Sequence, residues 1–232
     1  MLKLRVYNLE KKFKLHTQRG KTIKVLNSIS FNLKQGEFLT IIGPSGVGKS
    51  TILKCIYRTY KPTSGEIILT KDNGENINLH SIEDDEILEI RKKELGYVSQ
   101  FLRVLPRVST LKLVAKPLLE LGVAEKEARE RAQELLLLLG IKESLHDLSP
   151  LTFSGGEQQR VNIARAIIAP KRLLLLDEPT ASLDETRKKI VIDILKKLRE
   201  KDKVTIIGIF HEFDLIKDVS DRFLKIGSFY NE

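Results

Sequence analysis

The chain has 232 residues, of which 41% are hydrophobic and 31% are charged, a composition typical of a soluble globular protein with ample length for a buried core. No segment reaches the ~18 apolar residues that a membrane-spanning helix needs, and the first ten residues lack the apolar region of a signal peptide. The single cysteine, Cys55, excludes an internal disulfide, and we expect it to be a small packed apolar residue. Together these features favour a cytoplasmic protein.

The positive charge of the chain is concentrated near its beginning. The net charge is +9, and residues 1–24 carry eight Lys or Arg side chains against one Glu. Such a segment can contact nucleic acid, an anionic membrane surface or an acidic protein, or it can be an ordinary solvated surface. Charge alone does not indicate nucleic-acid binding, and we favour the solvated surface.

Strand patterns alternate with helix patterns along the chain. Residues 25–43 predict two strands joined by a turn at 34–36, and a helix at 49–60 and a strand at 65–70 follow. The alternation predicts a parallel α/β sheet with a helical insertion at roughly 102–152. The remaining predicted elements are an exposed helix or loop at 84–96, helices at 110–122 and 124–140 that end at Gly122 and Gly140, a helix at 155–169, a strand at 172–178, a helix at 185–201, and strands at 203–210 and 221–227.

A glycine-rich loop lies between a predicted strand and a predicted helix. Residues 43–51 read GPSGVGKST and match the phosphate-loop pattern G-x-x-x-x-G-K-[ST] in the context that this pattern requires. Glycines let main-chain N–H groups face phosphate oxygens, and the helix N-terminus adds a favourable partial charge. We expect Lys49 to reach the β- and γ-phosphates and Ser50 to offer its hydroxyl to Mg²⁺. The predicted nucleotide-binding residues of the loop are Gly43, Pro44, Ser45, Gly46, Gly48, Lys49, Ser50 and Thr51.

An apolar strand ends in two acidic residues. Residues 173–178 read LLLLDE, and such a strand delivers Asp177 to the carboxyl edge of the sheet, beside the phosphate loop, where ligands gather in folds of this kind. We predict that Asp177 holds Mg²⁺, directly or through water. Glu178 is the predicted catalytic residue, because its carboxylate is placed to polarise an attacking water.

A second phosphate-binding pattern follows the predicted helical insertion. Residues 153–160 read FSGGEQQR, and Ser154, Gly155 and Gly156 at the start of a helix are expected to form an anion-binding cap, with Glu157 beside them. One nucleotide cannot easily use both this cap and the phosphate loop of the same chain. A sandwich of two subunits around the nucleotides is the economical explanation.

These motifs resemble those of the ATP-binding cassette (ABC) ATPases, over essentially the whole chain. Two mild departures occur, since Phe153 and Glu157 replace the commoner Leu and Gln of that family. The resemblance implies one domain over residues 1–232 with the P-loop NTPase fold of ABC ATPases: an α/β RecA-like core sheet, an antiparallel β-subdomain and an inserted α-helical subdomain. The motifs that carry it are the phosphate loop, Gln100, SGGEQ at 154–158, LLLLDEP at 173–179, SLD at 182–184 and His211.

The resemblance also implies roles for single residues and for the ligands ATP and Mg²⁺. Gln100 would approach Mg²⁺ and the attacking water, and His211 would contact the γ-phosphate and position that water. Asp184 would lie at the seam between this chain and a second ABC subunit, in a homodimer or a heterodimer. Phe13 occupies the place of an aromatic residue that stacks on adenine, with a core phenylalanine as the alternative.

Resemblances to two branches of the family predict different partners. RKKELGYVSQ at 91–100 and PTSGE at 62–66 resemble ATPases of lipoprotein-release and macrolide-export systems, which would place the chain on a membrane permease at the inner membrane face. Residues 96–123 and 152–166 more closely resemble the PhnL-type ABC subunit of the carbon–phosphorus lyase system. That resemblance implies phosphonate breakdown with soluble lyase subunits, linked to the synthesis of ribose 1-phosphonate 5-triphosphate. Phe210 and Glu212, around the histidine, depart from the Thr and Asp usual in exporters.

The segment Phe101–Arg107 is expected to face the partner. It mixes aromatic, aliphatic and basic residues, a composition that suits docking, and in the family it lies where cassettes exchange force with their partners. The alternative is that Leu102, Val104 and Leu105 belong to the core of the helical subdomain. A nucleic-acid partner is not favoured, because the paired cassettes, zinc modules or long coiled coils of such proteins are absent from this sequence.

Overall fold

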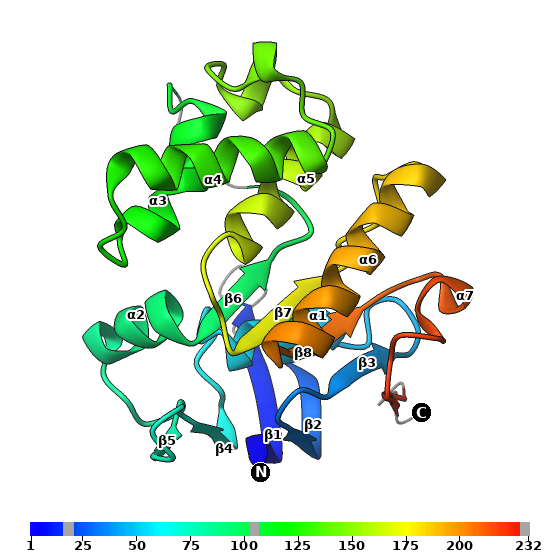
Figure 1. Ribbon diagram of the computed structural model, residues 1–232. Helices are drawn as coiled ribbons and strands as arrows, with labels where there is room; N and C mark the ends of the chain where they lie inside the picture. The colour runs from blue at the N-terminus through cyan, green and yellow to red at the C-terminus, as the bar shows by residue number, and fades with distance from the viewer. Residues whose placement is uncertain (16–20, 103–106, 228–232) are drawn as a thin grey trace.

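Two sheets organise the part of the chain that the computed structural model describes, residues 1–15, 21–102 and 107–227 (Figure 1). The larger sheet has five strands, and all of its neighbouring strands are parallel, as the alternation of strands and helices predicted. Its strands, in spatial order, are β6 (Leu95–Val98), β7 (Leu173–Asp177), β8 (Thr205–Ile209), β3 (Phe38–Ile42) and β9 (Arg222–Lys225).

Both faces of this parallel sheet are buried, and the leucine run of β7 shows why. Leu173 and Leu175 belong to one hydrophobic cluster, whereas Leu174 and Leu176 belong to another on the opposite face. Successive strand side chains point to opposite faces, so a strand that is covered on both sides reads as an unbroken apolar run. Strand β7 is buried at every position, and it ends with Asp177 at the carboxyl edge of the sheet.

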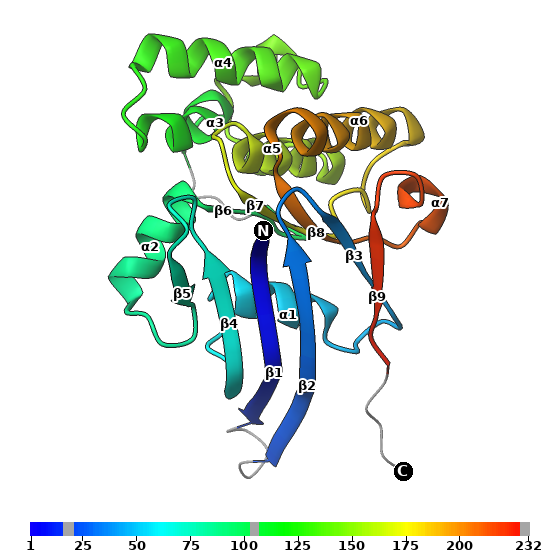
Figure 2. The same ribbon diagram turned by 60° about the horizontal axis from the view of Figure 1, so that its bottom comes forward.

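The smaller sheet is antiparallel and has the spatial order β2-β1-β4-β5. The turn predicted at 34–36 is present, but the two strands that it joins lie in different sheets (Figure 2). The strand at 2–15 was not predicted, because register shifts around Asn8 break the alternation that identifies strands. The strands are β1 (Leu2–Leu15), β2 (Lys21–Lys34), β4 (Ser64–Thr70) and β5 (Asn76–Asn78), of which β5 was also not predicted.

Helix α1 (Lys49–Ile56) lies between the two sheets (Figure 2). Its buried residues share one cluster with residues of β1, β2 and β4 and with one face of the parallel sheet. Cys55 is fully buried there, as predicted, and burial raises the pKa of its thiol to about 12. The helix ends earlier than the predicted residue 60, because Arg58 adopts a positive φ of 65°.

The remaining helices lie largely where sequence patterns predicted them. Gly122 and Gly140 have positive φ values of 83° and 72° and follow α3 and α4, as expected for glycines that end helices. These two helices share one continuous core with α5 and α6, so the separate helical subdomain at 102–152 stays a prediction. The helices are α2 (Asp84–Lys93), α3 (Thr110–Leu119), α4 (Glu125–Leu138), α5 (Gly155–Ile167), α6 (Glu185–Asp202) and the unpredicted α7 (Phe213–Ile216).

The basic residues near the start of the chain do not form one solvated surface. Lys3 is buried and pairs with Glu94 at 2.8 Å, so the surface prediction is wrong for this residue. Lys24 pairs with Glu10 at 3.0 Å near the surface and fits the prediction. Residues 16–20, which include Arg19, lie outside the described part of the chain.

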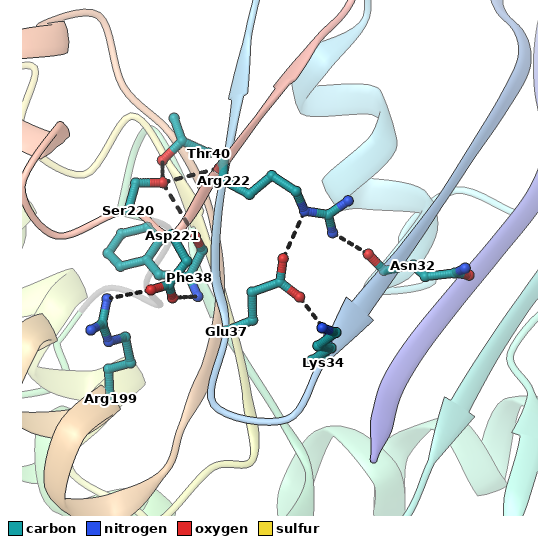
Figure 3. A network of polar contacts seen from close by, with 9 residues as sticks. All are labelled: Asn32, Lys34, Glu37, Phe38, Thr40, Arg199, Ser220, Asp221 and Arg222. Carbon is teal, nitrogen blue, oxygen red and sulfur yellow. Dashed lines mark hydrogen bonds and ion pairs between the residues drawn. The ribbon is translucent and has the colours of Figure 1, made fainter.

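A network of polar contacts ties β9 to the end of β2, to the start of β3 and to α6 (Figure 3). Arg222 donates to Glu37 Oε1 at 2.7 Å and to the carbonyl of Asn32 at the end of β2. Asp221 pairs with Arg199 of α6 at 3.2 Å, and its other oxygen accepts the first main-chain N–H of β3 at 2.8 Å. Asp221 and Arg222 thereby hold the start of the strand that carries the phosphate loop, and they are themselves held by Arg199 and by the carbonyl of Asn32.

Candidate active site

The phosphate loop runs from β3 to α1, and its glycines are required by space and by backbone conformation. A Cβ atom on Gly43 would lie 2.3 Å from the carbonyl oxygen of Ile226, so only glycine fits against the end of β9. Gly48 has a φ of 100°, and a Cβ there would lie 2.8 Å from the side chain of Leu26. The loop therefore curls tightly against both sheets, as the pattern predicted.

Lys49 lies within the curl of the loop. It is buried, and its Nζ donates to the carbonyl oxygens of Gly43 and Pro44, each at 2.8 Å. The first turn of α1 has no acidic residue that would oppose an anion at the helix N-terminus. A cavity of about 200 Å³ opens here, lined by Val25, Ser45, Gly46, Gly48, Lys49, Ser50, Thr51 and Glu178. A cradle of main-chain groups with a lysine at its centre fits a polyphosphate.

Ser50 and Asp177 converge, as predicted for a magnesium site. Ser50 Oγ donates to Asp177 Oδ1 at 2.7 Å, and Asp177 is only 2% exposed. The other carboxylate oxygen, Oδ2, accepts from the hydroxyl of Tyr97 at 3.0 Å. Hydroxyl and carboxylate oxygens suit Mg²⁺, which takes one or two protein ligands and fills its shell with phosphate oxygens and water.

Two observations bear on the metal site beyond the predicted residues. Within residues 1–15, 21–102 and 107–227, no group of three or more His, Cys, Asp or Glu side chains is placed to hold a metal ion. Tyr97 was missed by sequence analysis, although its place on β6, three residues before Gln100, could have pointed to it. Ser50, Asp177 and Tyr97 are therefore the side chains that define this part of the site.

Glu178 is held between two side chains from distant parts of the chain. Its Oε1 lies 2.7 Å from His211 Nε2, and its Oε2 accepts from Gln100 Nε2 at 3.1 Å. Glu178 also has a φ of 53°, a conformation that is strained for a residue with a side chain and is often found at functional sites. The three predicted catalytic residues thus come together at the carboxyl edge of the sheet, beside the loop cavity that Glu178 lines.

The predicted anion-binding cap at the start of α5 is occupied by a side chain of the same helix. Glu157 Oε2 accepts from the main-chain N–H of Ser154 at 3.0 Å and from its hydroxyl at 2.7 Å, and the two residues form a capping box. These hydrogen bonds hold the pKa of Glu157 below its usual value. None of the residues that line the loop cavity comes from this segment, so the cap and the phosphate loop do not converge within one chain.

Asp184 and Phe13 lie away from the loop cavity. Asp184 caps α6 and accepts from the main-chain N–H of Arg187 at 2.9 Å. Phe13 is half-buried on β1, with its ring edge-to-face against Tyr60 at 5.1 Å and Lys11 Nζ 4.9 Å from its centre. Phe13 is a member of neither hydrophobic cluster, but Tyr60, on which its ring packs, borders one of them, so the core alternative stays open. Stacking on adenine stays a prediction for Phe13, as does the dimer seam for Asp184.

The segment that follows Gln100 is described only in part. Phe101 is 72% exposed, and Arg107 is exposed as well. Leu102 is half-buried and packs against the core that contains α3 to α6, in agreement with the core alternative for this residue. Residues 103–106, which include Val104 and Leu105, lie outside the described part of the chain.

The geometry assigns the chain to a class of protein. A lysine in a main-chain cradle after a buried parallel strand, with a serine and an aspartate meeting beside it, is the arrangement that P-loop NTPases use to hold a nucleotide and its magnesium ion. Glu178, the residue after that aspartate, lines the same cavity. The site therefore belongs to a P-loop nucleotide hydrolase.

Comparison with known proteins identifies the family. A family model described as ABC transporter matches residues 26–181. An uncharacterized ABC transporter ATP-binding protein of Methanocaldococcus jannaschii, MJ0796, is 36% identical over 94% of this chain and 89% of its own length. The lipoprotein-releasing system ATP-binding protein LolD of Legionella pneumophila is 36% identical over 95% of both chains. The chain belongs to the ABC transporter family and is one of its ATPases.

Solved structures agree with this assignment. The dimeric post-hydrolysis state of the ATP-binding cassette MJ0796, bound to ADP and Pi, superposes with a TM-score of 0.87 at 33% identity, over 99% of this chain and 97% of that one. The predicted ABC ATPase fold is thereby confirmed. Among the described residues, no helix is long and apolar enough to cross a membrane. The finer resemblance to PhnL-type subunits stays a prediction, because the relatives named above are of other kinds.

Proposed function

We propose that this chain hydrolyses ATP at the site formed by the phosphate loop, Asp177 and Glu178. The observation that carries the proposal is the carboxylate of Glu178, which lines the loop cavity and is held by Gln100 and His211. In the proposed reaction a water oxygen forms a bond to the γ-phosphorus, and the bond from that phosphorus to the bridging oxygen of ADP breaks. Glu178 accepts the water proton, and the products are ADP and phosphate.

The other residues of the site bind and orient the substrate. Lys49 and the main-chain N–H groups of the loop neutralise the phosphates, and His211 orients the γ-phosphate and Glu178. Ser50 and Asp177, with Gln100 nearby, are the residues that would hold Mg²⁺. When bound, the ion supplies positive charge that offsets the negative charge developing on the phosphate oxygens.

We further propose that two subunits share each nucleotide. The cap at Ser154 lies on a different part of the chain from the loop cavity, and the two do not converge within one subunit. The dimers solved for the similar cassette support the same arrangement. In such a dimer, Ser154, Gly155 and Gly156 of one subunit face the ATP on Lys49 of the other, and Asp184 lies near the seam.

A mixing experiment tests the shared site. Lys49→Ala disables the phosphate loop, and Ser154→Ala disables the cap, so each variant alone should release phosphate slowly. A mixed dimer places both defects in one site and leaves the other intact, so mixing the inactive variants should restore part of the activity. Mixtures no more active than either variant alone would mean that each ATP uses the residues of only one chain.

A membrane permease of a release or export system is the first candidate partner. It is supported by relatives named for lipoprotein release in Legionella pneumophila and in Aquifex aeolicus, the latter 40% identical over 83% of both chains. The ATPase would then sit on the permease at the inner membrane face, and nucleotide-driven closure of the dimer would move the permease.

The carbon–phosphorus lyase machinery is the second candidate partner, and its support is the resemblance of residues 96–123 and 152–166 to PhnL-type subunits, with the departures at Phe210 and Glu212 from the exporter pattern. Phe210 is buried and lies 6.1 Å from Phe38, ring centre to ring centre. Glu212 pairs with Lys188 of α6 at 2.6 Å. Both departures from the exporter pattern are thus integrated into packing and ion pairing. In this role the ATPase would serve soluble subunits of phosphonate breakdown, linked to the synthesis of ribose 1-phosphonate 5-triphosphate.

Co-purification separates the two candidates. The tagged chain would be expressed in its host, and its partners identified from both the soluble and the detergent-solubilised fractions. Arg107→Glu reverses an exposed charge on the predicted docking segment and should weaken the capture of the true partner, whereas Lys126→Glu on α4 is a matched exposed control. A permease in the detergent fraction supports the first candidate, and soluble lyase subunits support the second.

A further inference from the structure

The magnesium-binding carboxylate is held by two donors, and only one of them belongs to the phosphate loop. Asp177 is 2% exposed, with Ser50 donating to one oxygen and Tyr97 to the other. An ionised carboxylate that is removed from water needs a donor on each oxygen, because an unpaired buried charge is strongly unfavourable. The hydroxyl of Tyr97 therefore determines the plane in which the carboxylate faces the loop.

The ring of Tyr97 is itself held by a stack. It lies against the ring of Tyr57 at 4.9 Å between centres and 25° between planes. The guanidinium of Arg91 covers Tyr57 at 4.6 Å, and its Nε donates to the carbonyl of Tyr57 at 3.0 Å. The stack therefore fixes the position from which the Tyr97 hydroxyl donates to Asp177.

We propose that Tyr97 is a positioning residue of the magnesium site, which orients Asp177 through its hydroxyl and is itself oriented by Tyr57. The inference rests on the proposed function, since it concerns how that site binds its metal. It also connects the site to a second region, because Tyr57, Tyr97 and Arg91 line a cavity of about 550 Å³ that includes neither Lys49 nor Ser50. A change in this cavity that displaces Tyr57 alters metal binding.

The test measures magnesium rather than turnover. A fluorescent ATP analogue is bound to the purified full-length chain at increasing Mg²⁺ concentrations, and its affinity is measured separately in EDTA. Tyr97→Phe keeps the ring and removes the hydroxyl, so the Mg²⁺ concentration for half-maximal effect should rise by about tenfold to a hundredfold, as for other groups that orient a metal ligand. The affinity in EDTA should not change.

Tyr57 provides both the matched control and the test of the stack. Tyr57→Phe keeps the stacked ring and should behave as the wild type. Tyr57→Ala removes the stack and should raise the Mg²⁺ requirement. In the double variant, Tyr57→Ala should not raise the Mg²⁺ requirement above that of Tyr97→Phe alone, because Tyr57 acts through the Tyr97 hydroxyl, which is then missing.

The possible failures are distinguishable. If Tyr97→Phe binds the analogue with the Mg²⁺ dependence of the wild type, the inference is overturned while the proposed function stands. If the effects of Tyr97→Phe and Tyr57→Ala simply add, the stack does not act through Tyr97, and that part is overturned. If the wild type itself binds no nucleotide, the proposed function fails first.

Discussion

Replacement of Glu178 by glutamine separates catalysis from folding more cleanly than any other change in this site. The amide oxygen of the new side chain can accept from Gln100, and its NH₂ group can donate to His211 once the ring carries its proton on Nδ1. The change therefore costs about 1–2 kcal/mol, the difference between hydrogen bonds to a charged and to a neutral group. For a chain of this length, that lowers the melting temperature by roughly 2–8 °C.

The effect on turnover should be far larger than the effect on stability. Loss of a general base reduces a rate by about 10²- to 10⁴-fold, which corresponds to about 3–5 kcal/mol of activation free energy. ATP binding should remain, since Glu178 contacts neither Lys49 nor Ser50 in the interactions described above. We expect a variant that binds ATP, accumulates as an ATP-bound dimer in analytical ultracentrifugation, and scarcely releases phosphate.

The control is a carboxylate away from the site that also accepts from two side chains, although it is more exposed than Glu178. Glu75, in the turn between β4 and β5, also accepts two side-chain contacts, from Lys71 at 3.2 Å and from Asn73 at 3.4 Å. Glu75→Gln should leave phosphate release unchanged. Release by Glu178→Gln within about threefold of the wild type, far less than the loss of a general base produces, would refute the catalytic role of Glu178.

Three further predictions concern the loop, the cap and the buried thiol. Gly43→Ala should abolish nucleotide binding and lower the melting temperature, because its Cβ meets the carbonyl of Ile226, whereas Gly46→Ala, with open space around it, should cost only about 1 kcal/mol of conformational energy in thermal unfolding. Ser154→Ala should slow phosphate release and leave equilibrium ATP binding largely intact; lost binding would contradict the two-subunit site. Between pH ~9 and 12, the free energy of unfolding should fall as pH rises, because Cys55 keeps its proton in the folded state up to a pKa of about 12 and loses it earlier when unfolded, and Cys55→Ala should remove this part of the slope in denaturant titrations.

Elements that follow local rules were predictable from the sequence. The strand that ends at Asp177 was predicted from its leucine run, because a strand buried on both faces is apolar throughout. The helix ends at Gly122 and Gly140 were predicted because glycine readily adopts the left-handed conformation that ends a helix. Strand β1 was not predicted, and the reason is equally local, since its register shifts interrupt the alternation on which strand prediction depends. The same rules could not place β2 and β3 in different sheets, because pairing partners are distant in the chain.

Several contacts in the site join residues that are far apart in the chain, and local sequence patterns do not predict such contacts. Tyr97 and Asp177 are 80 residues apart, and the one local hint that Tyr97 belongs to the site is its place three residues before Gln100. Gln100 and Glu178 are 78 residues apart, and they were expected to be close only through the family resemblance. Glu157 was seen as part of an anion-binding cap, but its reach back to Ser154 depends on the rotamer that the helix end allows.

The position of β9 beside β3 has a consequence for synthesis of the protein. The main-chain N–H of Ile226 donates to the carbonyl of Ile42 at 2.8 Å, and Gly43 rests against the carbonyl of Ile226. The ribosome makes the loop that binds phosphate well before it makes residue 226, which forms one wall of that loop. The carbonyl of Ile226 cannot pack against Gly43 until residue 226 has emerged, so we expect incomplete products that stop before β9 to bind ATP more weakly than the full chain.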